Sequence, residues 1–199
     1  MRDLDAIIKA YDVRGTYPDQ LDEDLAREVG AAFVRVVRAA TRDGGPGAVV
    51  VARDMRPSGP SLVAAFADGV REQGCDVILI GLASTDGLYF ASGRLDLPGA
   101  MFTASHNPAR YNGIKLCRAG AAPVGEETGL RQIKAAVADG LLERGEEQGR
   151  AEQLDLLPEF VAHVRSFVDL DALAPLRVVA DTANGVGGLV VPADRKSVV

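Results

Sequence analysis

Residues 99–116, GAMFTASHNPARYNGIKL, decide how we expect this chain to fold. The apolar run 99–103 predicts a buried strand, and 112–116 predicts a second strand after a short loop. The loop is too short for the crossover connection that parallel strands need, so the two strands should be antiparallel. Pro108 keeps the residue before it out of the helical conformation, and Ser105 lies where the first strand ends. The sequence therefore predicts a rigid turn that exposes a serine at the rim of a sheet.

Strands and helices alternate outward from this pair. Further strands are predicted at 6–9, 48–52 and 75–80, and helices at 22–42, 58–74, 85–94 and 126–138. Asp22 and Ser58 should cap the first two helices, because their side chains can accept hydrogen bonds from exposed helical N–H groups. The alternation favours an α/β fold: a three-layer α/β/α domain with a mixed, mostly parallel four-stranded sheet. Reacting groups in such sheets lie beyond the carboxyl ends of strands, which places Arg53 and Ser105 on one rim.

The composition is that of a globular protein with an acidic balance. Hydrophobic residues make up 47% of the 199 residues, enough for a buried core. The formal net charge is −6 and no basic stripe occurs, which argues against nucleic acid as a partner. No apolar run is long enough to cross a bilayer or to act as a signal peptide, so we expect no membrane partner and a cytoplasmic location. Cys75 and Cys117 lack a metal-binding spacing and are predicted to be buried free thiols.

The expected parts of the chain are a first domain at 1–145, the truncated start of a second, similar domain at 152–193, and a non-native tail at 194–199. The polar stretch 144–153 should be a linker. The second part should contain a helix at 156–168 and a strand at 176–180. No helix is expected after the glycine-rich turn 181–188, and one such unit cannot bury its own faces. The tail DRKSVV is the translation of GATCGGAAGAGCGTCGTG, which resembles the end of a common sequencing adapter, so we expect the reading frame to have run into adapter sequence.

Four blocks of sequence carry a resemblance to one enzyme family. They are KAYDVRG at 9–15, ARDMRPSG at 52–59, TASHNPARYNGIKL at 103–116 and DTANGVGG at 181–188. In this order they resemble the α-D-phosphohexomutase superfamily, in particular phosphomannomutase/phosphoglucomutase. The third block is the most specific of the four, and the resemblance covers nearly the whole chain.

The resemblance implies an intramolecular phosphotransferase, an isomerase that interconverts hexose 1-phosphates and hexose 6-phosphates of mannose, glucose or both. Ser105 would be phosphorylated in the resting enzyme and would act through a hexose 1,6-bisphosphate intermediate. Arg14 would hold charge near the phosphoserine and bind substrate, and Tyr11 would line the cleft. His106 and Lys115 would transfer protons to and from sugar hydroxyls, with Lys115 also binding substrate. A lysine acts as a base only when its pKa is lowered, which burial among cations would do.

The resemblance also implies Mg²⁺, which offsets the charge that develops in phosphoryl transfer. Ser105 would bind this metal through its phosphate. The other ligands of the family are three aspartates in an Asp-Gly-Asp-Gly-Asp-Arg loop, and this sequence contains no such loop. We therefore expect the chain to be inactive by itself.

Two alternatives stay open at this point. Phosphoglucosamine mutase is disfavoured, because Tyr111 stands where that branch tends to carry an acid before Asn-Gly. A non-catalytic phosphosugar-binding module, or an inert truncated product, fits the missing aspartate loop. The cluster of Arg53, Asp54 and Arg56 is open in the same way, either as part of the active-site rim or as a solvated group of ion pairs.

Overall fold

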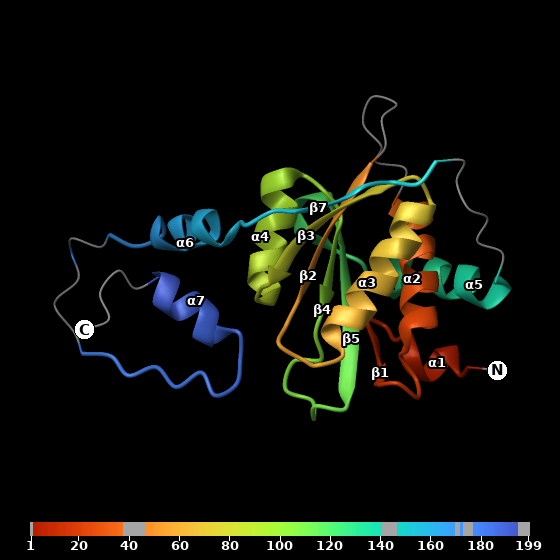
Figure 1. Ribbon diagram of the computed structural model, residues 1–199, viewed down its shortest axis with the longest axis horizontal. Coiled ribbons are helices and arrows are strands. Elements are labelled where there is room, and N and C mark those ends of the chain that lie inside the picture. The colour runs from red at the N-terminus through yellow and green to blue at the C-terminus, as the bar shows by residue number, and fades with distance from the viewer. Residues whose placement is uncertain (1, 38–46, 141–146, 170–171, 173–176, 195–199) are drawn as a thin grey trace.

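The strands of the computed structural model form one seven-stranded sheet over the residues that the structure describes, which are 2–37, 47–140, 147–169, 172 and 177–194. The strand order is β1-β5-β4-β2-β3-β7, with β6 attached to β5. The bounds are β1 Val13–Thr16, β2 Ala48–Arg53, β3 Asp76–Leu82, β4 Gly99–Phe102, β5 Tyr111–Arg118, β6 Ala122–Pro123 and β7 Ala151–Gln153. Figure 1 shows this sheet between helices on its two sides.

The strand directions confirm the mixed, mostly parallel sheet. β2 is parallel to both β3 and β4, and β3 is parallel to β7. β5 is antiparallel to its neighbours β1, β4 and β6. Among the described strands, β5 therefore runs against all the others. The predicted antiparallel pair around the serine loop is confirmed, with Phe102 opposite Ile114.

Alternating side chains of the central strands build one apolar cluster on each face of the sheet, as the two-residue period of a strand dictates. Val49 and Val51 of β2 belong to the larger cluster, beneath α2 and α3. Val50 and Ala52 belong to the smaller cluster, beneath α4. The covering helices are α2 Glu23–Val37, α3 Gly59–Glu72 and α5 Arg131–Asp139 on one side and α4 Thr85–Leu95 on the other (Figure 1). The predicted three-layer α/β/α arrangement is confirmed.

The sheet is wider than the predicted four strands. The opening strand predicted at 6–9 is wrong: Leu4–Ile7 form the short helix α1, because the Asp3 carboxylate accepts the Ala6 N–H and caps it. The first strand, β1, begins only at Val13. The predicted linker 144–153 also contains a strand, because β7 pairs with the open edge of β3. Its exposed polar side chains carry no strand pattern, so the pairing depends on backbone hydrogen bonds.

The two predicted helix caps have different outcomes. Asp22 does cap α2, since its carboxylate accepts the Leu25 N–H at 2.9 Å. The predicted extension of this helix over 38–42 lies outside the described residues. Ser58 precedes α3 but makes no side-chain cap. Its hydroxyl oxygen instead accepts a hydrogen bond from the Asn112 side chain of β5 at 2.9 Å. The predicted helix 126–138 consists of a π-helical turn, η3 Glu126–Leu130, followed by α5; between β5 and η3 lies a short 3₁₀ turn, η2 Ala119–Ala121.

The C-terminal part departs most from the sequence prediction. The predicted helix 156–168 is confirmed in shortened form as α6 Leu157–Arg165. The predicted strand 176–180 is not formed at 177–180, which has no regular structure, and residue 176 lies outside the described residues. A helix does follow the glycine-rich turn, contrary to expectation: α7 Gly187–Asp194. Residues 195–199 of the predicted tail lie outside the described residues. None of the described helices combines the length and apolar character needed to cross a membrane.

The cysteines give a testable consequence of the core. Neither forms a disulfide and both are buried, and burial raises the pKa of the Cys117 thiol. The Cys117 side chain is thus both inaccessible and protonated at neutral pH. In the native chain we expect N-ethylmaleimide to modify Cys117 about 100-fold more slowly than an exposed thiol. Peptide mass spectrometry after timed labelling measures this rate, with labelling in urea as the control. Fast native-state labelling of Cys117 would mean that the inner sheet is open to solvent.

Candidate active site

The serine loop joins the end of β4 to the start of β5. Ser105 is exposed and adopts a left-handed backbone conformation with φ of 54°. A residue with a side chain pays roughly 1–3 kcal/mol for such a conformation, which persists only where surrounding contacts enforce it. One such contact is the Ser105 N–H, which donates to the Thr103 hydroxyl oxygen at 3.0 Å. The strained backbone therefore marks Ser105 as a candidate functional residue.

His106 lies directly beside that hydroxyl. The Ser105 Oγ and His106 Nδ1 atoms are 3.3 Å apart, and the donor depends on the histidine tautomer. Both side chains are exposed, so each can reach a molecule bound at the rim. A serine and an imidazole in hydrogen-bond contact form a pair in which a proton can move to or from the oxygen.

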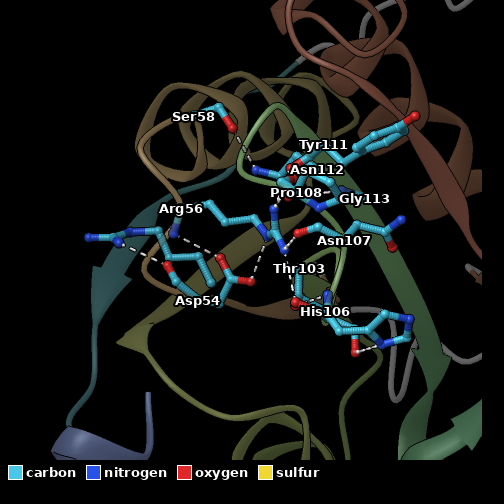
Figure 2. A network of polar contacts seen from close by, with 12 residues as sticks. Asp54, Arg56, Ser58, Thr103, His106, Asn107, Pro108, Tyr111, Asn112 and Gly113 are labelled. Carbon is cyan, nitrogen blue, oxygen red and sulfur yellow. Dashed lines mark hydrogen bonds and ion pairs between the residues drawn. The ribbon is translucent and has the colours of Figure 1, made fainter. Parts of the chain in front are cut away.

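Asp54 and Arg56 lie beneath the loop and hold it from inside (Figure 2). They are 7% and 8% exposed, and the Arg56 Nε donates to the Asp54 carboxylate at 3.2 Å. The Asp54 N–H also donates to the Phe102 carbonyl at 2.9 Å, which brings the ends of β2 and β4 to the same rim as predicted. The interpretation of this cluster as solvated ion pairs is wrong for Asp54 and Arg56, because the loop covers both.

A second charged group lies on the neighbouring strands β1 and β5. Arg14 of β1 donates to the Asp12 carboxylate at 2.5 Å, and the Lys115 Nζ of β5 lies 3.6 Å from the same carboxylate. The antiparallel register explains the meeting: Val13 is opposite Ile114, so Asp12 comes next to Lys115, and the side chains of Asp12, Arg14 and Lys115 share the other face of the sheet. Asp12 is therefore shared by two of the predicted site residues.

Arg14 also connects this group to the serine loop. Its Nη1 donates to the Asn107 side-chain oxygen at 2.8 Å. Its Nε is buried and has no hydrogen-bond partner among the described residues. A buried donor of this kind ordinarily has an acceptor. This N–H could donate to an anion bound beside Arg14, next to the loop that carries Ser105.

The other predicted site residues are placed less favourably. Lys115 is not buried among cations: its side chain is 30% exposed and paired with Asp12. Lys115 therefore lacks the buried, cation-rich surroundings that we expected for a lysine acting as a base. Tyr11 lies in the turn before β1 and is 82% exposed, so it packs against no core. The structure brings Ser105, His106, Arg14 and Lys115 to one rim and leaves Tyr11 on the surface beside it.

Three residues organise the site without having been assigned to it from the sequence. Asp12 was overlooked although it lies in the block 9–15, and its position opposite Lys115 depends on the β1–β5 register. Arg56 and Asp54 were noticed, but their burial under the loop has no sequence signature. The available signal was their spacing directly after a buried strand, which is where sheet rims collect polar groups.

An apolar groove lies elsewhere, between α4, α6 and α7. Phe90, Phe160 and His163 stack along it, with ring centroids 5.0 Å apart for Phe90 and His163. It includes none of the predicted site residues, so the chemistry of the serine loop is separate from this groove.

The described residues do not form a magnesium site by themselves. They contain no group of three or more His, Cys, Asp or Glu side chains that could hold a metal ion. The two carboxylates described above, Asp12 and Asp54, form ion pairs with Arg14, Lys115 and Arg56. The donor set here therefore does not fit Mg²⁺, and no step through a metal follows from these residues.

Comparison with known proteins identifies the family. A family model described as phosphoglucomutase/phosphomannomutase, alpha/beta/alpha domain I, matches residues 5–144. The chain belongs to the phosphoglucomutase/phosphomannomutase family. The resemblance drawn from the four sequence blocks is thereby confirmed.

Relatives of this family member agree with the assignment. Phosphohexose mutases from Xanthomonas campestris pv. campestris are 42% identical over 184 residues, which are 92% of this chain and 40% of the relative. A phosphomannomutase from Escherichia coli K12 is 37% identical over 188 residues, which are 93% of this chain and 40% of the relative. The crystal structure of a phosphoglucomutase/phosphomannomutase family protein from Burkholderia thailandensis has a TM-score of 0.84 and 38% identity, covering 98% of this chain and 42% of that one. The chain thus spans about two fifths of the length of these relatives.

Proposed function

We propose that this chain is the phosphoserine-bearing part of a mutase that interconverts hexose 1-phosphates and hexose 6-phosphates of mannose, glucose or both. The observation that carries the proposal is the setting of Ser105. Its hydroxyl is exposed on a loop whose backbone is strained at Ser105, and it contacts the His106 ring. The Arg14 guanidinium donates to Asn107, two residues further along the same loop. Family membership and the names of the relatives support a phosphohexose mutase.

The phosphoryl transfer proceeds in two steps. In the first, the bond between phosphorus and Ser105 Oγ breaks while a bond forms between phosphorus and a sugar hydroxyl oxygen; the hydroxyl proton passes to a base, and the freed serine oxygen takes up a proton. The contact between the His106 ring and Ser105 supports His106 as that base. The product is a hexose 1,6-bisphosphate. In the second step the bond between phosphorus and the other sugar oxygen breaks, phosphorus bonds to Ser105 Oγ as the serine proton leaves, and the freed sugar oxygen takes up a proton. Arg14 would hold the phosphate oxygens, because a planar guanidinium matches them in two-point contact.

The partners of the proposal are hexose phosphates and hexose 1,6-bisphosphate, without nucleic acid or membrane, in the cytoplasm. Mg²⁺ belongs to the proposal for a full-length enzyme only, with Ser105 as a ligand through its phosphate and the remaining ligands outside the described residues. Lys115 would act as a charged substrate-binding group beside Asp12, and Tyr11 would face the sugar from the surface.

A second candidate is supported by the missing metal site. A chain without three grouped metal ligands among its described residues fits a non-catalytic phosphosugar-binding module or an inert product. Phosphoglucosamine mutase is the alternative within the family. Turnover assays of the same enzyme on mannose, glucose and glucosamine phosphates show which of these sugar phosphates is the substrate. Binding of a sugar phosphate without turnover would favour the non-catalytic binding module.

The proposal is tested in a chimera in which residues 5–144 replace the matching domain of the Xanthomonas relative. After treatment with glucose 1,6-bisphosphate, trypsin should release peptide 95–110 with one added phosphate of about 80 Da. This peptide has only two hydroxyl side chains, Thr103 and Ser105, and Thr103 is 6% exposed. Fragment ions should therefore place the phosphate on Ser105.

The control is the 199-residue chain alone, for which we expect no mutase turnover. An active chimera whose peptide 95–110 stays unmodified throughout turnover would refute the phosphoserine proposal.

A further inference from the structure

The Arg56 guanidinium has every one of its donors in use. Its five N–H groups are the full donor set of an arginine. Nε donates to the Asp54 carboxylate, Nη1 donates to the Pro108 and Tyr111 carbonyls at 2.9 and 2.8 Å, and Nη2 donates to the Ser105 and Asn107 carbonyls at 2.8 Å each. Four of the five bonds thus end on main-chain carbonyls, three in the serine loop and one at Tyr111, the first residue of β5, and Figure 2 shows the loop folded around the guanidinium.

The loop needs these donors because it has no strand neighbour to pair with. Carbonyl groups of a strand have partners in the sheet, whereas those of an irregular loop require partners from elsewhere. Asp54 keeps the guanidinium oriented, since its second oxygen accepts the Arg56 backbone N–H at 2.9 Å. The arrangement depends on a planar fork with donors in fixed directions. A lysine has three donors on one point charge and cannot serve four carbonyls and a carboxylate.

The contacts fix both peptide groups of Ser105. The carbonyl of Ser105 accepts from Arg56, and its N–H donates to the Thr103 hydroxyl. With both sides held, φ stays at 54° and the Cα–Cβ bond has one direction. The side chain can then rotate only about its own Cα–Cβ bond. Arg56 lies 8% exposed beneath the loop, so it supports the serine without facing the rim where a sugar phosphate would bind.

We propose that Arg56 is a positioning residue that holds the Ser105 oxygen in line for phosphoryl transfer. The role of Arg56 in phosphoryl transfer rests on the proposed function, whereas its role in holding the loop does not. Because in-line transfer depends on placing the reacting atoms accurately, a displacement of about 1 Å can lower the rate on the order of 100-fold. Loosening the loop should therefore lower kcat while leaving the groups that bind the sugar in place.

The first test measures amide hydrogen exchange by NMR in the full 199-residue chain. Arg56→Lys keeps the charge and loses the fork, so exchange at the N–H groups of Ser105, Asn107 and Tyr111 should rise about 30-fold. Amides of the central strands β2 and β3 should not change. Arg53→Lys is the matched control, because the Arg53 guanidinium donates to the Asp54 carbonyl and to no carbonyl of the loop. It should leave loop exchange unchanged.

The second test makes Arg56→Lys in the chimera that carries residues 5–144 of this chain. We expect kcat to fall about 100-fold and KM for the hexose phosphate to stay within about twofold. If Arg56 only supported folding, the lysine variant would contain less active enzyme at every substrate concentration, and faster amide exchange would not be confined to the loop.

Each outcome decides the proposal. Faster loop exchange together with lower kcat at constant KM supports it, whereas unchanged loop exchange or unchanged kcat overturns it. If the β2 and β3 amides also exchange faster in Arg56→Lys, Asp54→Asn replaces it, because this variant keeps the side-chain shape and removes only the charge that orients the fork. Unchanged loop exchange in that variant would likewise overturn the proposal. Failure of the phosphoserine proposal shows separately, as full activity without the Ser105 hydroxyl, and leaves the exchange result standing.

Discussion

Replacing Ser105 with alanine in the chimera should lower mutase kcat on the order of 10⁴-fold or more, because the atom that carries the phosphoryl group is removed. No neighbouring group can substitute for it. The Thr103 hydroxyl is buried and already accepts the Ser105 N–H, and His106 has no hydroxyl oxygen to carry the group. A coupled assay of hexose 6-phosphate formation, together with mapping of peptide 95–110, measures both the rate and the modification.

A glycine at the same position separates chemistry from backbone strain. Ser105→Gly also lacks the hydroxyl, but glycine adopts a φ of 54° without steric cost. We therefore expect both variants to be equally inactive, with the glycine variant at least as stable as the alanine variant. Ser61→Ala is the control within the same segment, because Ser61 is an exposed serine of α3 whose hydroxyl donates to the Ser58 carbonyl at 3.3 Å. Retention of wild-type turnover by either Ser105 variant would remove the serine from the mechanism.

The central fold could be predicted from the sequence because its strands are apolar on both faces. Runs such as 48–52 and 99–103 are buried between two layers of helices, and continuous apolar character is the expected signature of that position. β7 and β1 escaped prediction for the opposite reason. Their pairing depends on an unoccupied edge of the sheet, which becomes visible only after the other strands are assembled. The helix α1 likewise depends on one local cap from Asp3.

The candidate site could be located but not assembled from the sequence. Ser105 and His106 are adjacent in the chain, so their contact follows from local order. The meeting of Arg14 with Asn107 spans 93 positions and requires the β1–β5 register. The role of Arg56 was equally hidden, since an arginine in a polar loop is ordinarily solvated. Only the folded loop shows that four carbonyls turn inward around it.

The contact between α2 and α3 depends on two glycines that let the helix backbones touch. A Cβ atom added at Gly69 of α3 would lie 2.0 Å from the Arg27 carbonyl oxygen of α2, and one added at Gly30 would lie 2.3 Å from the Phe66 carbonyl oxygen. Neither obstacle is a flexible side chain, so the helices would have to move apart. These helices cover the larger apolar cluster, which extends to Phe102 at the start of the serine loop.

Gly69→Ala should therefore destabilise the chain by about 3 kcal/mol, although alanine is the better helix former. The matched control is Gly93→Ala in α4, where an added Cβ meets nothing within 4 Å. That change should stabilise the chain by about 0.5–1 kcal/mol through helix propensity alone. The chain contains no tryptophan, so urea unfolding followed by circular dichroism is the suitable measurement. Equal effects of the two substitutions would show that α2 and α3 are not in backbone contact.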